Sequence, residues 1–464
     1  MAFATTNQAT GEVEKTFDAH TPDEVEARLA RAAGAFEEYR RTTWAERSRL
    51  MASAADLLDG EQPDVARILT TEMGKTFASA KGEVSKCALG LRWFAEHAER
   101  LLADEEIDER SYVRYEPLGP VLAIMPWNFP LWQVVRFAAP ALMAGNVGVL
   151  KHAANVPQTA VYIEELFRRA GYPEGVFTTL LVTSGDVAPI IADERIAAVT
   201  LTGSERAGMA VAEAAGRALK KCVLELGGSD PFVVTASADL ERSASVGVTA
   251  RVQNNGQSCI AAKRFIVDAS VYDEWCDRFV SKMSSLVVGD PFEPATDVGP
   301  LVNATQREEI AAQVEDAREK GATVACGGFA PEGPGWYYKP TVLLDVTTEM
   351  RVLQEEVFGP VATVEKAADV DEAVRIANRT QYGLGSSVWT TDAAEARQLV
   401  EGIRAGQVFV NGMVGSSPEL PFGGIKRSGY GRELSEPGIK EFTNSKSVRA
   451  DSRASLPPRH AAAG

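Results

Sequence analysis

The stretch Val121-Leu-Ala-Ile-Met-Pro-Trp-Asn-Phe-Pro130 joins a short apolar run to a rigid polar turn. Similar apolar runs end at Leu150, Val182, Leu201 and Leu226, and helical patterns separate them. Short apolar runs that alternate with helices are typical of a parallel sheet covered by helices. The polar or glycine-rich turns after these runs therefore lie at the carboxyl ends of strands, where open α/β sheets bind ligands.

The rest of the chain divides around this sheet. A capping box at Thr21 begins helical patterns that continue to about residue 103, and residues 111–116 alternate like an exposed strand. A second α/β pattern starts near Pro231 and runs to about residue 434. We therefore expect an α/β protein of more than one domain.

Composition excludes several classes of partner. The chain has 464 residues, of which 45% are hydrophobic, enough for two or three domains. It carries 48 basic against 64 acidic side chains, a net charge of −16 with no compensating basic run, so nucleic acid is not an expected partner. No segment approaches the roughly 20 apolar residues that span a bilayer. The N-terminus also lacks signal-peptide features, so we expect a cytoplasmic protein without membrane contact.

Metal and disulfide chemistry find little support in the sequence. The 4 histidines have no metal-ligand spacing, and the 5 cysteines are unevenly placed with no CxxC pair. We expect reduced thiols and no metal site.

Cys259 is the candidate nucleophile. It lies in the polar, glycine-containing stretch Gln253-Asn-Asn-Gly-Gln-Ser-Cys-Ile260, which favours an accessible thiol. The other cysteines stand in apolar or helical contexts or, for Cys326, just before two glycines. The alternative for Cys259 is a free cysteine in a loop.

Two turns after strands are candidates for ligand contacts. Thr202-Gly-Ser204 precedes a helical pattern, whose unpaired first amides could bind a pyrophosphate; the alternative is a plain strand-to-helix turn, since GxGxxG is absent. Asn128 lies between prolines that would fix its amide as a donor to an oxyanion. The alternative is an asparagine that satisfies its own backbone.

Two acidic residues and one loop are the remaining candidates for a functional role. Glu225 ends an apolar strand and could be a base with a raised pKa, or could pair with a lysine such as Lys220. Glu356 could accept hydrogen bonds from a ribose, or could be a solvated loop acid. The glycine-dense residues 421–433 could wrap a site or could be a simple connection.

Seven ordered motifs decide between these alternatives. PWNFP, a lysine after the next strand, TGS, ELGG, NxGQxC, EExFGPV and PFGGxKxSGxGRE closely resemble the NAD(P)-dependent aldehyde dehydrogenase superfamily over about residues 10–450. Glu225 precedes Cys259 by 259 − 225 = 34 positions, and Glu356 follows it by 356 − 259 = 97, which also fits.

The resemblance implies the division of the fold. It implies a Rossmann-type coenzyme-binding domain in residues 1–97 and 118–228, and a catalytic α/β domain in residues 229–434. Residues 98–117 and 435–452 would form a small β extension through which the chain assembles as a homodimer or homotetramer. We expect residues 453–464 to be a disordered tail.

The resemblance also implies roles for the site residues. Cys259 attacks the aldehyde, Asn128 and the Cys259 backbone amide hold the oxyanion, hydride leaves for the nicotinamide, and Glu225 activates the hydrolytic water. Lys151 and Glu356 bind the riboses and Ser204 the pyrophosphate. The remaining cofactor-binding residues would be Trp127, Ala154, Gly203, Leu226 and Phe358. Ala154 stands where NAD-preferring members carry glutamate, so NADP is the preferred cofactor and NAD the alternative.

Within the superfamily, PWNFPLWQVVR, LKHAAN, KKCVLELGGSDPF and GQSCIAAKRF resemble the succinate-semialdehyde dehydrogenase branch. Ala261 replaces the second cysteine that forms a redox disulfide in some members, and Gln253 replaces an arginine common in this branch. Carboxylate recognition would then rest largely on Arg136, with Ser416 and Ser417 as further contacts. The alternative for Arg136 is a pairing with an acid at the edge of the core. The full predicted substrate set is Arg136, Trp132, Ser258, Ile260, Ser416, Ser417 and Phe422.

Three other functions compete with this prediction. A coenzyme-A-acylating dehydrogenase would have the same fold, but Glu225 argues against it. An inactive scaffold would not need Cys259, Asn128 and Glu225 together. A cysteine hydrolase lacks a histidine near Cys259 in the sequence and leaves the nucleotide motifs unexplained.

Overall fold

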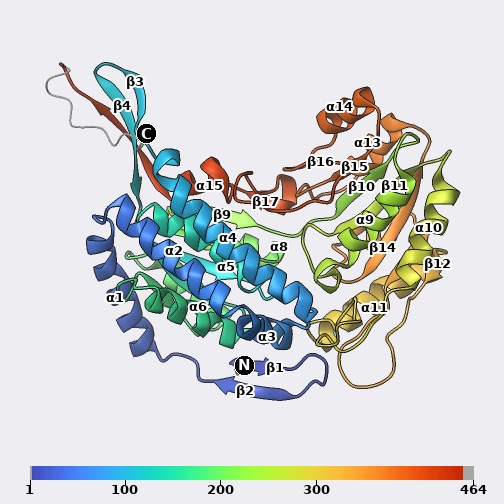
Figure 1. The fold of residues 1–464 in the computed structure, drawn as a ribbon, viewed down its shortest axis with the longest axis horizontal. Helices are drawn as coiled ribbons and strands as arrows, with labels where there is room; N and C mark the ends of the chain where they lie inside the picture. Colours follow the sequence, from blue (N-terminus) through green and yellow to red (C-terminus); the bar gives the residue numbers. More distant parts are fainter. Residues whose placement is uncertain (1–2, 453–464) are drawn as a thin grey trace.

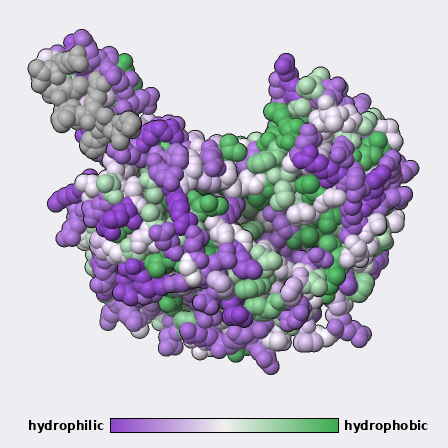
Figure 2. Space-filling model, in the orientation of Figure 1, coloured by the Kyte–Doolittle hydropathy of each residue, from purple (hydrophilic) through white to green (hydrophobic). Residues whose placement is uncertain are grey.

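The structure is a computed structural model and describes residues 3–452. Two lobes, each built on its own sheet, face each other, and a three-stranded arm projects from the first lobe (Figure 1). The surface is hollowed between the lobes (Figure 2). Within residues 3–452, no helix combines the length and the apolar character that crossing a bilayer requires. The tail predicted for 453–464 lies outside the described residues.

The first lobe contains the parallel sheet predicted from the apolar runs. Its strand order is β17-β9-β8-β5-β6-β7, in which β9 to β7 are parallel and β17 pairs antiparallel with β9. The largest difference from the predicted ends is in β7, which stops at Thr179 while residues 180–182 stay buried outside it. The strands β6, β8 and β9 end within two residues of the predicted positions. The strands are β5 Pro120–Met125, β6 Val147–His152, β7 Phe177–Thr179, β8 Ala198–Thr202, β9 Lys221–Glu225 and β17 Gly429–Tyr430.

Helices pack around this sheet. The first begins at the predicted capping box, where the Thr21 side chain accepts a hydrogen bond from the Glu24 amide and Pro22 takes the first helical position. The helices of this lobe are α1 Pro22–Tyr39, α2 Trp44–Gly60, α3 Gln62–Met73, α4 Phe77–Leu101, α5 Trp132–Met143, α6 Pro157–Arg169, η1 Ser184–Asp186, α7 Val187–Ala192 and α8 Glu205–Arg217.

The second lobe contains the second predicted α/β unit. Its sheet has the order β12-β13-β14-β11-β10-β15-β16 and is parallel apart from the edge strand β12. The strands are β10 Asp230–Val234, β11 Ala262–Asp268, β12 Thr323–Cys326, β13 Thr341–Leu344, β14 Val361–Ala367, β15 Ser387–Trp389 and β16 Phe409–Val410. The helices are α9 Leu240–Val252, η2 Gln253–Gly256, α10 Tyr272–Ser284, α11 Ala304–Glu319, α12 Arg351–Gln354, α13 Val370–Asn378 and α14 Ala393–Gly402.

The chain crosses from one sheet to the other in four residues. β9 ends at Glu225 in the first lobe, and β10 begins at Asp230 in the second. Glu225 therefore lies where the two lobes meet. The η3 turn Lys426–Ser428 leads into β17, which returns from the second lobe to pair with β9.

Two small antiparallel sheets stand outside the lobes. β1 Phe3–Thr6 pairs with β2 Val13–Phe17. The arm has the order β18-β4-β3, with β3 Glu105–Asp108, β4 Ser111–Pro117 and β18 Thr443–Arg449. Residues 98–101 belong to helix α4 and residues 435–441 to helix α15 Ser435–Glu441, so the strands occupy only part of each predicted segment. Assembly through this arm stays a prediction.

Candidate active site

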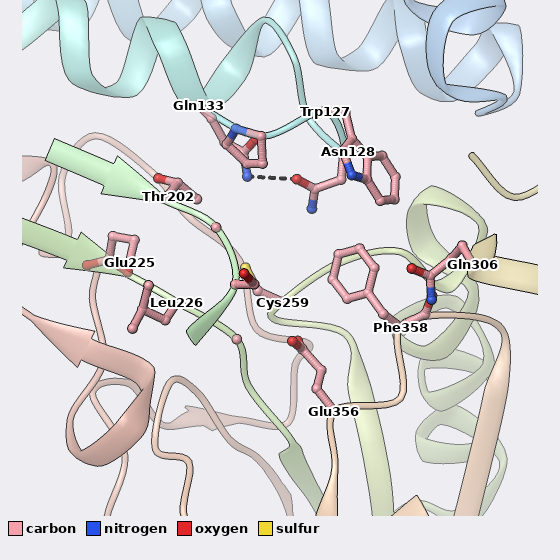
Figure 3. A pocket seen from close by; sticks show the side chains of 14 residues that line it. Trp127, Asn128, Gln133, Thr202, Glu225, Leu226, Cys259, Gln306, Glu356 and Phe358 are labelled. Atoms are coloured by element: carbon pink, nitrogen blue, oxygen red, sulfur yellow. Dashed lines mark hydrogen bonds between the residues drawn. The ribbon is translucent and has the colours of Figure 1, made fainter. Parts of the chain in front are cut away.

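A cavity of about 250 Å³ opens where the two lobes meet, at the carboxyl ends of β5, β8 and β9 (Figure 3). It brings together many of the predicted residues. All three predicted catalytic residues line it, with Trp127, Gly203, Ser204, Leu226, Glu356 and Phe358 of the predicted cofactor set. The other lining residues are Pro126, Gln133, Thr202, Gly227 and Gln306. They were not given a catalytic, cofactor-binding or substrate-binding role in the prediction, although Pro126, Thr202 and Gly227 lie in predicted motifs.

A sharp turn carries Cys259 into this cavity. Asn254 and Asn255 have φ angles of 56° and 58°, a left-handed conformation that asparagine tolerates better than most residues. Gly256 follows at φ 77°, and a Cβ there would lie 2.4 Å from the Gly359 carbonyl carbon. The polar stretch before Cys259 is therefore a constrained turn and not a loose loop.

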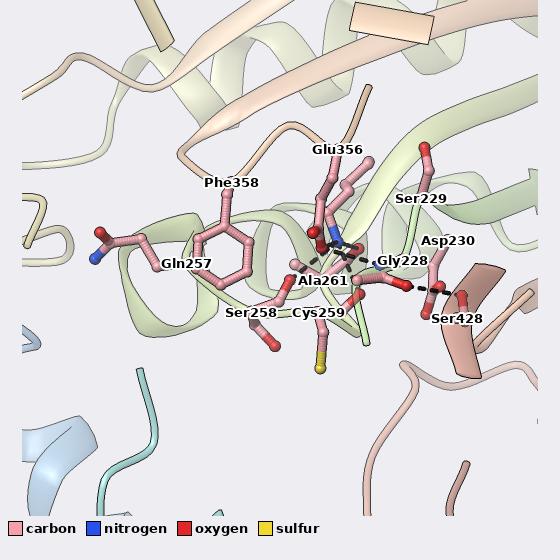
Figure 4. A network of polar contacts seen from close by, with 12 residues as sticks. Gly228, Ser229, Asp230, Gln257, Ser258, Cys259, Ala261, Glu356, Phe358 and Ser428 are labelled. Carbon is pink, nitrogen blue, oxygen red and sulfur yellow. Dashed lines mark hydrogen bonds and ion pairs between the residues drawn. The ribbon is translucent and has the colours of Figure 1, made fainter. Parts of the chain in front are cut away.

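Lys263 holds the main chain around the nucleophile. Its buried ammonium donates to the carbonyls of Ser258 at 3.0 Å, Cys259 at 2.8 Å and Ala261 at 3.4 Å. The same Nζ lies 3.5 Å from Glu356 Oε1. Figure 4 shows Glu356 close to Ser258, Cys259 and Ala261. One side chain thus ties the nucleophile turn to a predicted cofactor residue.

The Cys259 thiol faces the cavity and is partly buried. Burial raises the pKa of this thiol to about 12, while the positive charges of Arg136 and Lys263 act in the opposite direction. The thiol is therefore protonated at neutral pH. Because only the thiolate attacks, the site must supply a proton acceptor.

Asn128 reaches across the site and does not bond within its own turn. Its Nδ2 donates to the Gln257 carbonyl at 3.1 Å, and its Oδ1 accepts from Gln133 Nε2 at 3.0 Å. Asn254 Nδ2 donates to the Asn128 carbonyl at 2.7 Å, which fixes the backbone as well. The amide is held beside the nucleophile turn, as an oxyanion donor requires.

Glu225 is buried at the end of β9, with 2% of its surface exposed. Within residues 3–452, neither carboxylate oxygen has a hydrogen-bond partner. Burial and then the negative charge of Glu433 raise the pKa of Glu225 well above its usual value. The alternative pairing with Lys220 does not occur, because that ammonium donates to the Asp193 carbonyl.

The glycine-dense loop of residues 421–433 wraps Glu225. Gly429 pairs with Glu225 where β17 joins β9, and a Cβ on Gly423 would lie 2.5 Å from Glu225 Oε1. The loop is therefore part of the site and not a simple connection.

Arg136 has a protein carboxylate as its partner. It is 3% exposed, forms an ion pair with Glu433, and donates to Thr202 Oγ1 at 3.2 Å. Its guanidinium lies 4.4 Å from the centre of the Phe422 ring. It does not line the cavity, so the structure corrects the expectation of an arginine free for the substrate: it has the acid partner that the sequence left as the alternative.

The predicted cofactor residues form a surface that fits a dinucleotide. Ser204 caps α8 by accepting from the Ala207 amide at 3.3 Å, and the start of this helix borders the cavity. Trp127 and Phe358 meet edge to face with ring centres 5.7 Å apart. Glu356 accepts from the Gly228 amide at 3.0 Å and is not a solvated loop acid. A helix start, aromatic walls and a fixed carboxylate suit a pyrophosphate, a nicotinamide and a ribose.

Lys151 and Ala154 lie beside this surface and not in the cavity lining. Lys151 is the next-to-last residue of β6, and its backbone lies opposite Ile124 of β5. Burial lowers the pKa of its ammonium, and no carboxylate within the described residues lies in ion-pair distance of it. An unpaired cation at this strand end suits an anionic group on a ribose.

The predicted substrate residues fall into three places. Trp132 Nε1 donates to Ser416 Oγ at 2.9 Å, which brings α5 and the loop before residue 421 together. Phe422 is buried under Arg136. Ser258 and Ile260 are buried on either side of Cys259 in the sequence, and the Ser258 hydroxyl has no hydrogen-bond partner among the described residues. Ser417 follows Ser416 and is partly exposed.

Sequence reasoning missed three charged residues of the site. Lys263 and Glu433 act on Cys259 and Glu225, and Lys86 on α4 contacts the predicted substrate residues Trp132 and Ser416. Lys263 left a signal, because a lysine at the start of an apolar strand needs polar partners. Lys86 left none, because lysine is ordinary on an amphipathic helix.

Among the described residues, no group of three His, Cys, Asp or Glu side chains is arranged to hold a metal ion. The cavity brings a thiol, an amide and a carboxylic acid together beside a dinucleotide surface. This combination defines a thiol-dependent oxidoreductase.

The chain belongs to the aldehyde dehydrogenase family. The sequence model described as "Aldehyde dehydrogenase family" matches residues 1–448. The chain is 59% identical over 454 residues to succinate-semialdehyde dehydrogenase [NADP(+)] 1 of Mycobacterium tuberculosis, covering 97% of this chain and 99% of the relative. It is 58% identical over 455 residues to succinate-semialdehyde dehydrogenase [NADP(+)] of Mycobacterium avium, covering 97% and 96%.

Solved structures agree with this assignment. The succinic semialdehyde dehydrogenase of Streptococcus pyogenes, in complex with NADP⁺ as the cofactor, superposes with a TM-score of 0.95 at 37% identity. The match covers 97% of this chain and 100% of that one. The aldehyde dehydrogenase fold is therefore established over nearly the whole length.

Proposed function

We propose that this enzyme oxidises succinate semialdehyde to succinate, with NADP⁺ as the preferred acceptor of the hydride. The observation that carries the proposal is the meeting of Cys259, Asn128 and Glu225 in one cavity beside a dinucleotide surface. The names of relatives that are 59% and 58% identical support the substrate and the cofactor.

The reaction begins with the loss of the thiol proton. Glu225 in its ionised form accepts the Cys259 proton, and the thiolate sulfur bonds to the aldehyde carbon. The carbonyl oxygen becomes an oxyanion, which accepts hydrogen bonds from Asn128 Nδ2 and the Cys259 amide. When bound, NADP⁺ supplies the acceptor for the hydride that leaves this carbon.

The loss of hydride leaves a thioester on Cys259. Glu225 first releases the Cys259 proton to solvent and then, ionised again, takes a proton from a water molecule whose oxygen attacks the thioester carbon. The carbon–sulfur bond breaks, the carboxylic acid leaves, and the Cys259 thiolate takes the proton from Glu225, which restores the thiol and the ionised base. The raised pKa of Glu225 suits both steps, since a buried carboxylate is a stronger base than an exposed one.

The test is a panel of aldehydes with each nicotinamide cofactor. We expect kcat/KM for succinate semialdehyde to exceed that for its uncharged methyl ester, and NADP⁺ to be used at least as well as NAD⁺. Added coenzyme A should leave the rate and the free acid product unchanged, because Glu225 activates water. Equal kcat/KM for the acid and its ester would refute the substrate proposal.

We further propose that the enzyme is a cytoplasmic homodimer or homotetramer assembled through its arm. Among the described residues, β18 pairs only with β4, so its other edge has unpaired backbone groups. The exposed side chain of Ile107, 61% accessible, adds an apolar contact on the same arm. Light scattering on the full chain and on a variant with Ser447→Pro, which cannot donate at that position, tests the proposal.

A further inference from the structure

The side-chain amide of Asn128 lies between two partners and keeps one hydrogen free. Its Nδ2 donates to the Gln257 carbonyl at 3.1 Å, and its Oδ1 accepts from Gln133 Nε2 at 3.0 Å. Figure 3 shows the Gln133 and Asn128 side chains pointing toward each other, with Asn128 Nδ2 on the side that faces Cys259. An asparagine amide carries two hydrogens. Among residues 3–452 the second one has no acceptor, and Asn128 lines the cavity, so this hydrogen is available to a substrate oxygen.

Gln133 brings a second buried amide to the same cavity. It is the second residue of α5, and 2% of its surface is exposed. Burying an amide costs free energy unless its polar atoms are hydrogen-bonded. Gln133 Oε1 accepts from the Phe129 amide at 3.4 Å, and its Nε2 donates to Asn128. The side chain therefore folds back from the helix onto the turn that carries Asn128.

Backbone groups at both ends fix the direction of these hydrogen bonds. The Phe129 N–H can only donate, so Gln133 presents its oxygen there and its NH2 group to Asn128. The Gln257 carbonyl can only accept, so Asn128 presents its NH2 group there and its oxygen to Gln133. Reversing either amide would place two donors or two acceptors against each other. The direction of both amides therefore follows from the main chain around them.

The direction of the Asn128 amide decides whether it can stabilise an oxyanion. An alkoxide that forms on the substrate carbon is stabilised by an N–H and destabilised by a carbonyl oxygen. The terminal torsion of an asparagine side chain has a broad preference, so a single hydrogen bond does not hold the amide plane. The Gln257 carbonyl is also shared, because it accepts from Asn254 Nδ2 at 3.0 Å. A second anchor on the oxygen end is therefore needed.

Other contacts hold only the main chain of the turn. Asn254 Nδ2 donates to the Asn128 carbonyl at 2.7 Å, and His152 Nε2 lies 2.8 Å from the Pro130 carbonyl. Neither contact reaches the Asn128 side chain. Within the described residues, Gln133 is the one side chain that is hydrogen-bonded to the Asn128 amide.

We propose that Gln133 is a positioning residue for the oxyanion step. Its NH2 group holds the Asn128 amide so that Nδ2 faces the carbonyl oxygen of the substrate. Gln133 acts through Asn128 and exchanges no proton, because its amide stays neutral throughout. The inference rests on the proposed function, which assigns Asn128 to the oxyanion.

The first measurement is kcat/KM for succinate semialdehyde with NADP⁺ in Gln133→Met, a side chain of similar length without a donor. Losing the bond leaves Asn128 Oδ1 buried without a partner and should lower kcat/KM by about 5- to 30-fold. Alkylation of Cys259 by iodoacetamide forms no oxyanion, so its rate at the same pH should change by less than about twofold. Gln62→Met removes a side-chain donor on α3 outside the cavity lining and is the matched control, which should leave both rates unchanged.

A double-mutant cycle then shows whether Gln133 acts through Asn128. Asn128→Ala removes the oxyanion donor and should lower kcat/KM by about 100- to 1000-fold. Adding Gln133→Met to Asn128→Ala should lower it by less than about twofold further, because the group that Gln133 orients is gone. A merely structural role would cost the same factor in both backgrounds.

Gln133→Glu is the second variant, should Gln133→Met fold poorly. It has the same shape, and its carboxylate accepts from the Phe129 amide but cannot donate to Asn128. The Asn128 amide would then turn its NH2 group toward this carboxylate and its oxygen toward the substrate. The added charge also raises the pKa of the Cys259 thiol, so the loss is measured relative to the alkylation rate at the same pH. On that scale kcat/KM should fall by about 100-fold or more.

The outcomes separate the two proposals. Unchanged kcat/KM in Asn128→Ala overturns the oxyanion role in the proposed function. A loss in Asn128→Ala without a loss in Gln133→Met overturns the positioning role alone, and so does the same loss from Gln133→Met in both backgrounds. Parallel falls in kcat/KM and in alkylation by Gln133→Met mean that Gln133 supports the whole turn, and they also overturn the positioning role.

Discussion

Arg136 and Glu433 form a buried ion pair beside Glu225, with 3% of each side chain exposed. The negative charge of Glu433 raises the pKa of Glu225, and the positive charge of Arg136 lowers it. Burial raises the pKa of Glu225 most, and the two charges of the pair adjust it in opposite directions. Two substitutions separate the electrostatic role of the pair from its structural one.

Glu433→Gln should shift the acid limb of the kcat–pH profile to lower pH. Removing a like charge lowers the pKa of Glu225, and Arg136, left without its anion, lowers it further. Glu225 would then be ionised at lower pH. The measurement is kcat against pH, with Glu436→Gln, an exposed acid paired with Lys440, as the control. If the acid limb of the kcat–pH profile stayed at the same pH, the electrostatic effect of Glu433 on Glu225 would be contradicted.

Arg136→Leu should destabilise the protein and lose activity on all aldehydes. Removing one partner of a buried ion pair costs about 3–5 kcal/mol, because the other charge stays buried and unpaired. Denaturant unfolding measures the loss, and Arg217→Leu, in an exposed ion pair with Glu213, should cost little. We expect equal falls in kcat/KM for the acid and its methyl ester. If kcat/KM fell for the acid but not for its methyl ester, Arg136 would be the residue that binds the substrate carboxylate.

Cys259→Ser should abolish turnover while cofactor affinity stays within a few-fold, because an alcohol is a far weaker nucleophile than a thiolate. Glu225→Gln removes the base that serves both steps, so it should slow the formation of the thioester as well as its hydrolysis, while the nucleophile itself is kept. Stopped-flow absorbance then detects a burst of reduced cofactor in the wild type and in any slow-hydrolysis variant, but not in Cys259→Ser. Cys222→Ser, at a partly buried thiol outside the cavity lining, is the control and should behave as wild type.

Lys263→Met should slow both alkylation of Cys259 and catalysis. The ammonium lowers the pKa of the Cys259 thiol, so its loss raises that pKa and reduces the thiolate fraction at any given pH. Alkylation by iodoacetamide, followed at a series of pH values, should therefore need higher pH than in the wild type. Lys282→Met, on an exposed face of α10, is the control. If the pH dependence of alkylation did not change, Lys263 would only hold the main chain around Cys259 and would not affect the pKa of the thiol.

The sequence predicted the parts of the site that ordered motifs carry. The turns after β5, β8 and β9 were predicted because apolar runs end at Met125, Leu201 and Leu226, each within one residue of the end of the strand. The nucleophile turn was predicted because its residues are small and polar. Strand ends are local features, so a local pattern suffices to find them. Apolar runs that alternate with helical patterns predicted the two sheets in the same way.

Partners of buried charges could not be predicted in this way. Arg136 and Glu433 are 433 − 136 = 297 positions apart, and Lys86 meets Ser416 across 330. No periodicity records which distant charges meet, because the meeting depends on how the two lobes close on each other. The expectation that Arg136 would be free for the substrate failed for this reason, and Lys86 was missed for the same one.

The last prediction concerns cofactor choice and rests on Lys151, the next-to-last residue of β6, and on Ala154, which follows that strand. Lys151 has no carboxylate partner within the described residues, so it can bind the 2′-phosphate of NADP⁺ without competition. Ala154→Glu would add an anion that repels this phosphate and accepts a hydrogen bond from the 2′-hydroxyl of NAD⁺. We expect the ratio of kcat/KM for NADP⁺ over NAD⁺ to fall by more than about tenfold, a difference of 1.4 kcal/mol. Ala153→Glu introduces the same charge one position earlier and should change the ratio less. A ratio unaffected by Ala154→Glu, or equally affected by both, would show that cofactor choice lies elsewhere.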